Sequence, residues 1–530
     1  MVAKTCKCNP KDVIPSEHFY AKGRVDVFMV LSLSAYLSVD SRENLDRVRG
    51  GKAFADAIKL LAPTNYFAKD RDEEQILDSG HDFQVFRRHL IRDWFFPTFY
   101  FQKELADIPD DPQLKMAVER YEVRIRMSRS GFLEIKLTRP TKHDGEKIIE
   151  ILRDLMELRL ANKGNFDDQS TMLKLALFCA DKFIENLPPV ISVREGEEDI
   201  TMALRPLGPN PETLPYRQRY ATLFLEEIYC RHCSNRRVEA DKLRQDYMDI
   251  LAAIVEGVLV LDDKNVVNFP IIDREAYSNL IDLASWKNDL CIFAPERALI
   301  YFPAQKIFIA GRDRTRVVDY KYYWECICRG IEHTIVIRTA LQSIAYSTTG
   351  ILETVPRLTE KVVDGNISKE DTQDILRMAR SFSYSFKTLP FIRDILVPSS
   401  SFRASYAVRK FEFLNETLHI QEVKDYVERN VDELVSFVQF FSSMELQQEL
   451  NQSQAAIDRA GFIITVVALL IAAPSFLVDF VQFLASKKSL SDVNIWVALS
   501  SLLLMGYWLY RFFRNQIHDL LEQQQKDRLK

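Results

Sequence analysis

The sequence predicts an α+β cytosolic part, mainly helical with β-hairpins, followed by a long stalk helix and a two-helix C-terminal transmembrane hairpin. Three observations predict this fold class. Two apolar runs without a charged residue lie near the end of the 530-residue chain, a long helical pattern precedes them, and strand-like alternation is confined to short stretches upstream.

Composition and motifs exclude several classes of function. The chain carries 70 Lys and Arg against 75 Asp and Glu, so no basic excess predicts direct nucleic-acid binding. Glycine is scarce, at 16 residues, and the motifs G-x-x-x-x-G-K-[ST], G-x-G-x-x-G, H-E-x-x-H and G-x-S-x-G are absent. We therefore expect neither an enzyme nor catalytic residues.

The first 187 residues are expected to form an N-terminal α/β domain. Helical patterns occupy 54–63, 81–101, 144–163 and 169–187. Between them, apolar and polar residues alternate over 121–128 and again over 133–138, and Ser130-Gly131 marks a turn. This pattern predicts a hairpin with one basic face.

A Pro-rich connection over 188–215 is the best internal boundary, and a second α/β domain is expected over 216–401. That domain should begin with one long helix over 216–254. Strand patterns follow at 257–269 and 291–311, and the chain becomes helical again after Arg312.

Residues 402–459 read as one stalk helix. Its apolar residues repeat at alternating spacings of four and three, which is a heptad seam formed by Val427, Val431, Leu434, Val438 and Phe441. No Pro or Gly interrupts the polar stretch that follows before Gly461, so the helix should continue into the first apolar run.

The apolar runs 460–478 and 493–510 are each close to the ~20 residues that cross a bilayer as a helix. We expect transmembrane helices over 460–484 and 493–513, an external loop over 485–492 and a cytoplasmic tail over 514–530. Basic residues outside the two runs place both termini in the cytoplasm of a multi-pass inner-membrane protein. Two buried core helices are the alternative interpretation.

Small and polar side chains share one face of the first apolar helix and of the stalk before it. This stripe predicts a pore lined by copies of the helix, and a helix-packing face of small residues is the alternative. The predicted pore-lining residues are Gln447, Asn451, Gln454, Asp458, Gly461, Thr465, Ala468, Ala472, Ser475, Asp479 and Gln482.

Arginine groups are the candidates for binding an anionic ligand, because guanidinium groups offer paired donors to phosphate oxygens. The hairpin group Arg124, Arg126 and Arg129 ranks first, since strand spacing holds its members on one rigid face. Two other groups lie at 312–316 and 87–92. A solvated or salt-bridged face is the alternative for each group.

Cysteine spacing gives no metal site. Cys230-x-x-Cys233 could begin a zinc site, but Cys326-x-Cys328 is too tightly spaced and too far downstream to complete it. We therefore expect structural thiols in a reducing compartment.

The C-terminal half resembles the CorA-type divalent-cation transporter family. The segment 465–480 matches that family's first membrane helix, with Thr465 and the mid-helix Pro474 in place. The family's Gly-Met-Asn signature is absent, because about Phe483-Leu484-Ala485 stand there, and the following loop carries two lysines. The resemblance implies a homo-pentamer in contact with membrane lipid.

The resemblance also implies a function. A subset of the family without Gly-Met-Asn accompanies type III CRISPR systems, which suggests an ion channel whose cytosolic part binds a nucleotide second messenger in antiviral defence. A Mg²⁺ transporter and a membrane-tethered scaffold are the alternatives. Mg²⁺ or a nucleotide would then be the small-molecule ligand.

Overall fold

The computed structural model describes most of the first 363 residues and the helices that follow. The described residues are 18–69, 97–160, 171–195, 197–208, 216–233, 236–261, 267–269, 281–284, 288–302, 306–310, 315–363, 389, 392, 405–449, 507, 511 and 514. The chain divides into two compact units. The first comprises Met1–Ala345 and Ser383–Tyr426, and the second comprises Tyr346–Phe382 and Val427–Lys530.

A 10-stranded mixed sheet is the centre of the first unit. Its main path runs in the order β13 (Leu290–Phe293), β14 (Arg297–Tyr301), β9 (Tyr216–Cys230), β1 (Phe19–Ser32), β5 (Phe132–Pro140), β4 (Glu122–Met127), β3 (Phe99–Phe101) and β2 (Phe67–Lys69). Neighbours are antiparallel except β14 and β9, which are parallel. Two short strands, β6 (Glu146–Lys147) and β10 (Arg236–Arg237), pair with β1 and β9.

Helices and small hairpins surround this sheet in the first unit. The helices are the 3-10 helix η2 (Leu33–Tyr36), α1 (Val39–Val48), α2 (Lys52–Leu60), α5 (Pro112–Arg120), α6 (Ile148–Leu160), α7 (Thr171–Glu185), α8 (Ala240–Gln245), α9 (Met248–Glu256) and α15 (Ser405–Thr417). Three separate hairpins are β7 (Val190–Glu195) with β8 (Glu198–Ala203), β11 (Val260–Leu261) with β12 (Val267–Asn268), and β15 (Lys306–Ala310) with β16 (Thr315–Asp319).

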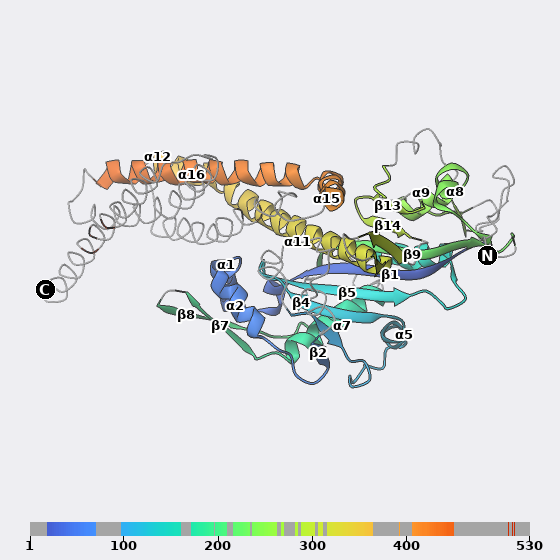
Figure 1. Cartoon of the computed structure of the whole chain (residues 1–530). Coiled ribbons are helices and arrows are strands. Elements are labelled where there is room, and N and C mark those ends of the chain that lie inside the picture. Colours follow the sequence, from blue (N-terminus) through green and yellow to red (C-terminus); the bar gives the residue numbers. More distant parts are fainter. Residues whose placement is uncertain are drawn as a thin grey trace. The chain divides into compact units, whose positions relative to one another are not determined.

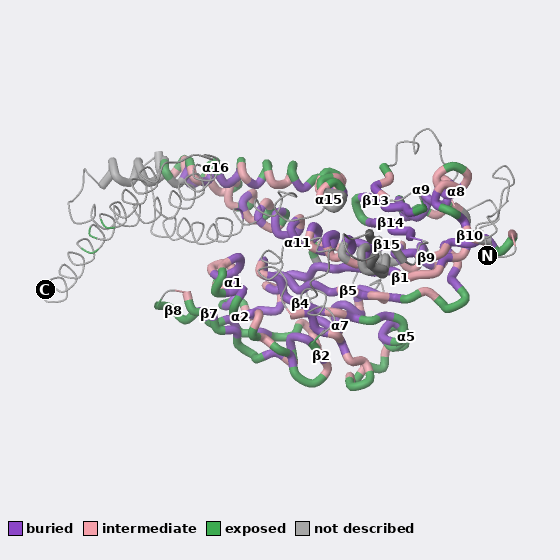
Figure 2. The backbone as a smooth tube through the Cα atoms, in the orientation of Figure 1, coloured by how far each residue is buried: buried purple, intermediate pink, exposed green. Residues whose placement is uncertain are grey.

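Both faces of the sheet are covered, because side chains alternate between the faces along each strand. On β1, Val25, Val27 and Met29 join the apolar core that also contains residues of α6 and α7. The residues between them point to the other face, which helix α11 (Tyr320–Leu352) covers. Figure 1 shows α7 and α11 on opposite sides of the central strands, and Figure 2 shows that these strands are largely buried.

Helix α11 packs closely against the sheet and against α15. Trp324 of α11 is fully buried, and its ring lies 6.5 Å from that of Phe302, which in turn lies 4.5 Å from Phe224 of β9. One turn and a half further along α11, Gly330 leaves space for the ring of Phe411 from α15, since a Cβ atom there would overlap that ring.

The described part of the second unit consists mainly of segments of three helices. It contains the last residues of α11, the helix α12 (Val355–Val363) and the part of α16 (Ile420–Glu449) from Val427 onward. The side-chain amide of Asn430 donates hydrogen bonds to Thr348 and Thr349 at 3.2 and 3.3 Å. Val427, Val431 and Leu434 of the expected heptad seam are buried, whereas the side chains of Val438 and Phe441 lie outside the description.

The predicted fold class is wrong in two respects. The strands form more than the expected hairpins, because the first unit contains a 10-stranded mixed sheet. Among the residues that the structure describes, no helix combines the length and apolar character needed to cross a membrane. The segments expected to do so, 460–484 and 493–513, lie outside the described residues except for Tyr507 and Arg511.

Individual elements also differ from the expectation. The predicted helix over 216–254 is instead the strand β9 followed by β10, α8 and α9. The stalk predicted as one helix over 402–459 is divided into α15 and α16, with His419 between them at a positive φ of 53°. The Pro-rich segment 188–215 contains the β7–β8 hairpin and lies within one unit rather than at a boundary. The hairpin of β4 and β5 is confirmed.

Replacing Gly330 should reveal how tightly α11 packs. We expect Gly330→Ala to lower the free energy of unfolding by about 1–3 kcal/mol, because the new Cβ atom overlaps the Phe411 ring in a filled core. Urea denaturation of the full chain, followed by tryptophan fluorescence, measures the change.

Gly350 of the same helix is the matched control, because a Cβ atom there meets nothing within 4 Å. Gly350→Ala should raise stability by up to about 1 kcal/mol through helix propensity. Equal effects of the two substitutions would contradict the packing argument.

Candidate functional site

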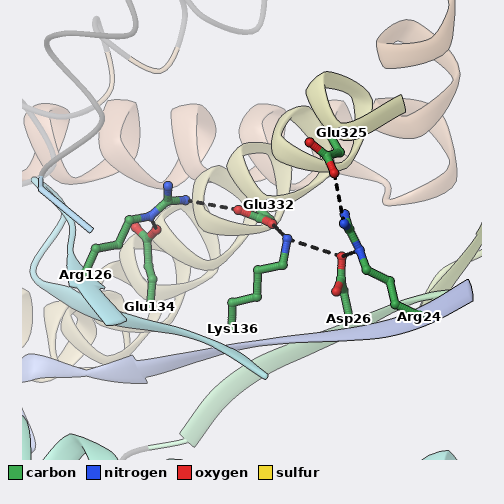
Figure 3. A network of polar contacts seen from close by, with 7 residues as sticks. All are labelled: Arg24, Asp26, Arg126, Glu134, Lys136, Glu325 and Glu332. Carbon is green, nitrogen blue, oxygen red and sulfur yellow. Dashed lines mark hydrogen bonds and ion pairs between the residues drawn. The ribbon is translucent and has the colours of Figure 1, made fainter. Parts of the chain in front are cut away.

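Seven charged side chains lie between the sheet and α11, and we refer to them as the charged cluster. They are Arg24 and Asp26 of β1, Arg126 of β4, Glu134 and Lys136 of β5, and Glu325 and Glu332 of α11. Residues two apart on a strand share a face, and residues seven apart on a helix are about two turns apart on the same side. The strand and helix periods therefore bring these side chains together (Figure 3).

Lys136 is the centre of the charged cluster. Its ammonium group lies 3.3 Å from Oδ2 of Asp26 and 2.7 Å from Oε1 of Glu332. Lys136 therefore joins a carboxylate of β1 to a carboxylate of α11. Glu332 lies 196 residues beyond Lys136 along the chain.

The outer members continue the cluster on either side of Lys136. Arg24 lies 3.1 Å from Asp26 and 3.0 Å from Glu325. Arg126 lies 3.7 Å from Glu332 and donates a hydrogen bond to Glu134. From Glu325 to Glu134 the charges thus alternate in sign, so each member has oppositely charged neighbours (Figure 3).

Inside the charged cluster, attraction between opposite charges shifts the pKa values of the central groups more than burial does. Burial alone would raise the pKa of Asp26 and of Glu332, but Lys136 with Arg24 or Arg126 holds both pKa values below the ordinary carboxyl range. The same carboxylates raise the pKa of Lys136 against its burial. The carboxylates therefore contribute stability above their ordinary pKa, and this contribution is lost as the pH falls through the lowered values.

Two neighbouring side chains are held neutral. Burial, together with Arg126 and Arg329, lowers the pKa of His333 well below its ordinary value. Burial raises the pKa of the Cys328 thiol, which is a free cysteine. Neither side chain therefore adds a charge to the charged cluster.

The charged cluster instead specifies one position of α11 on the sheet. A shift of the helix by one turn would bring Cys328 or Arg329 to the place of Glu332. Lys136 would then face a neutral or a positive group in a buried setting, which is costly. The cluster is therefore suited to holding a helix in a defined register.

The three arginines predicted to bind a ligand have different surroundings in the structure. Arg126 belongs to the charged cluster and is buried. Arg129 donates from Nε to the backbone carbonyl of Gly50 at 2.7 Å. Arg124 is half-buried and lies opposite Lys136 in the β4–β5 register. A ligand site on these three residues stays a prediction.

Most of the other predicted site residues lie outside the description. Of the pore-lining set, Gln447 lies within α16, and the remaining ten residues from Asn451 to Gln482 are outside the described residues. Of the alternative arginine groups, Arg316 lies in β16, and residues 87–92, 312 and 314 are not described.

The cysteine pair at 230 and 233 does not form half of a zinc site. Cys230 is a buried cysteine, whereas Cys233 is disulfide-bonded. Within the described part of the chain, no group of three or more His, Cys, Asp or Glu residues could hold a metal ion.

The charged cluster was missed at the sequence level, although a signal for it exists. Arg24-x-Asp26 and Glu134-x-Lys136 place charges two apart inside strongly apolar segments. Such a pattern puts charges on one face of a buried strand, where they need partners. The partner residues on α11 had no comparable local signal.

No relative was found. Comparisons with protein-family models, with curated proteins and with solved structures all give no match to this chain.

A second buried acidic site lies where α8 approaches β13. Asp289 is 1% exposed, and its backbone carbonyl accepts a 2.7 Å hydrogen bond from Arg244. Arg244 also pairs with Asp282, which accepts from the backbone N–H of Cys291 at 2.9 Å. Burial and the nearby Asp282 raise the pKa of Asp289 to about 7, although Lys410 and Arg244 oppose the shift.

Removing Lys136 should be strongly destabilising. Lys136→Met leaves Asp26 and Glu332 buried without their shared cation, which should cost about 3–5 kcal/mol of unfolding free energy. Urea denaturation measures the loss, and adding Glu332→Gln to Lys136→Met should recover part of it.

Lys59→Met is the matched control, because Lys59 pairs with an exposed Asp56 at 3.7 Å. Its effect should stay below about 1 kcal/mol. If both lysine variants lose the same stability, Lys136 has no special role.

The raised pKa of Asp289 predicts a specific pH dependence. The folded protein keeps this carboxyl protonated up to about pH 7, whereas the unfolded chain releases the proton near pH ~4. The folded state thus binds more protons between these values, so stability should fall as the pH rises through this window. Asp289→Asn should lose this part of the slope.

Urea midpoints of both proteins from pH 4.5 to 8, roughly spanning that window, test this prediction. Asp181, whose pKa burial raises to about 6, contributes a similar slope to both proteins and cancels in the difference. Parallel pH profiles would show that Asp289 does not titrate as described.

Proposed function

We propose that this protein is an oligomeric membrane effector whose α+β unit binds a small anionic ligand and thereby controls ion flux. The ligand class we favour is a nucleotide second messenger. The observation that carries the proposal is the charged cluster, which fastens α11 to the sheet through ion pairs rather than through apolar contacts alone.

Helix α11 is suited to carrying a change from one unit to the other. It is 33 residues long, and its residues up to Ala345 belong to the first unit, whereas those from Tyr346 belong to the second. A continuous helix transmits a displacement along its axis, because its hydrogen bonds resist local stretching. The state of the charged cluster can therefore reach the unit that contains the C-terminal apolar sequence.

A charged ligand can alter the ion pairs that hold α11 on the sheet. Burying paired charges stabilises little in net terms, so the register of α11 is well defined without being deeply stabilised. A ligand shifts such an equilibrium only if it binds one arrangement better than the other. An anion that competes for the arginines would meet this condition.

The sequence supports action at a membrane. The runs 460–478 and 493–510 contain no charged residue, whereas 27% of the whole chain is charged. The resemblance of 465–480 to a cation-transporter segment supports ion flux as the output. Both apolar runs lie outside the described residues.

Ion flux into liposomes tests the proposal directly. The full chain, reconstituted into vesicles loaded with a cation-sensitive dye, should give flux that rises when ATP or a cyclic nucleotide is added. Lys136→Met should weaken this response, because it removes the ion pairs that join α11 to the sheet. Empty vesicles and the Lys59→Met variant are the controls.

Other outcomes of this experiment favour the alternatives. Flux that is independent of nucleotides, together with rescue of a strain deficient in Mg²⁺ transport, would favour a Mg²⁺ transporter. The absence of flux under all conditions would favour a membrane-tethered scaffold.

A further inference from the structure

Two histidines lie side by side where β1 begins and β9 ends. His18 directly precedes β1, and His232 lies just beyond the last residue of β9. The two strands are antiparallel and remain paired as far as Phe19 and Cys230, which brings these segments of the chain together. The imidazole ring centroids of His18 and His232 are 5.4 Å apart, and the ring planes are inclined by 53°.

Backbone pairing holds both histidines in place. The N–H of Arg231 donates a 2.9 Å hydrogen bond to the carbonyl oxygen of His18, so the contact between the two segments continues beyond the strands. Within the strands, the paired residues Tyr20 and Tyr229 stack their rings with centroids 5.8 Å apart. The two imidazoles therefore stand at the firmly paired ends of strands of 14 and 15 residues.

The separation of the two rings fits two ligands of one metal ion. Zinc binds imidazole nitrogen at about 2.0–2.1 Å with tetrahedral angles, which places the centroids of two bound rings roughly 5 Å apart. The observed 5.4 Å is close to this value. His232 is exposed and His18 is partly exposed, so an ion can reach both rings from solvent.

Imidazole ligands select the class of ion. Zn²⁺, Ni²⁺ and Cu²⁺ bind imidazole well, whereas Mg²⁺ and Ca²⁺ prefer oxygen ligands. Among the described residues, no third His, Cys, Asp or Glu completes a metal-binding group with this pair. The described chain would thus supply two of four tetrahedral positions, and water can occupy the other two.

The cation that lies between the two histidines in the sequence is attracted to another group. The guanidinium of Arg231 lies 3.7 Å from the centre of the Tyr20 ring, and the face of an aromatic ring attracts a cation. This contact gives the positive charge of Arg231 a partner of its own beside the histidine pair.

We infer that His18 and His232 bind a divalent transition-metal ion, and Zn²⁺ is the ion that we favour. The ion would bridge the beginning of β1 and the end of β9. Because the two imidazoles are brought together only in the folded chain, the ion would stabilise the pairing of these strands. Zinc binding here is independent of the proposed ion flux, since neither histidine belongs to the charged cluster.

Calorimetric titration of the full chain with ZnCl₂ tests the site, after treatment with EDTA and in a buffer that does not chelate zinc. We expect saturable binding that His18→Ala and His232→Ala each weaken at least about tenfold. Loss of a group that only holds a metal ligand in place already costs about 10–100-fold in affinity, so loss of a ligand should cost no less. Excess Mg²⁺ should not displace the zinc.

His143→Ala is the matched control, because the His143 side chain is fully exposed and lies 3.4 Å from Asp144. This variant should bind zinc as the unaltered protein does. Zinc should also raise the thermal unfolding midpoint of the unaltered protein and of His143→Ala, but not that of His232→Ala. Without zinc, His232→Ala should unfold at the same temperature as the unaltered protein, which separates loss of a ligand from misfolding.

Three results would overturn the zinc site. They are the absence of saturable zinc binding by the unaltered protein, an affinity that either His18→Ala or His232→Ala leaves unchanged, and displacement of the bound zinc by Mg²⁺.

Discussion

The ammonium group of Lys136, shared between Asp26 and Glu332, is the interaction on which the arrangement of the first unit depends. It links the central strands to α11 across the face of the sheet that α6 and α7 do not cover. Without that cation, two buried carboxylates would lose the partner that they share, which is costly. The apolar contacts of Trp324 and Gly330 then close around a helix whose register is already set.

Such a design favours specificity over net stability. Apolar side chains of similar volume would hold α11 at least as firmly, and they would permit several registers along the sheet. Alternating charges permit one register, because a displaced helix brings like or neutral groups together. The opposite face of the sheet is built from Val, Ile and Leu side chains packed against α7, so the two faces serve different ends. One face supplies stability, and the other defines position.

The sequence predicted local elements better than long-range partners. The alternation of Val123 and Ile125 with charged residues predicted the β4–β5 hairpin, because one face of each strand is uniformly apolar. The sequence predicts a helix in place of β9, because Leu223 and Phe224 lie on opposite faces that are both buried, which removes the alternation. Arg126 was recognised as a notable charge, but its partner Glu332 lies on an element more than 200 residues away. No local sequence pattern indicates an ion pair between residues so far apart along the chain.

The two charged regions along α11 differ in a way that bears on how a signal could act. At Glu325 and Glu332 every charge has a partner of opposite sign, so a ligand could act there only by replacing an existing ion pair. At Arg338, less than two turns beyond Glu332, the charge is incompletely balanced and a donor lacks an acceptor. A ligand gains most where the protein has left interactions unmade, and its effect is largest where a defined register exists to be changed. Helix α11 places these two properties less than two turns apart, so a fully paired region and an incompletely paired donor lie close together on one element.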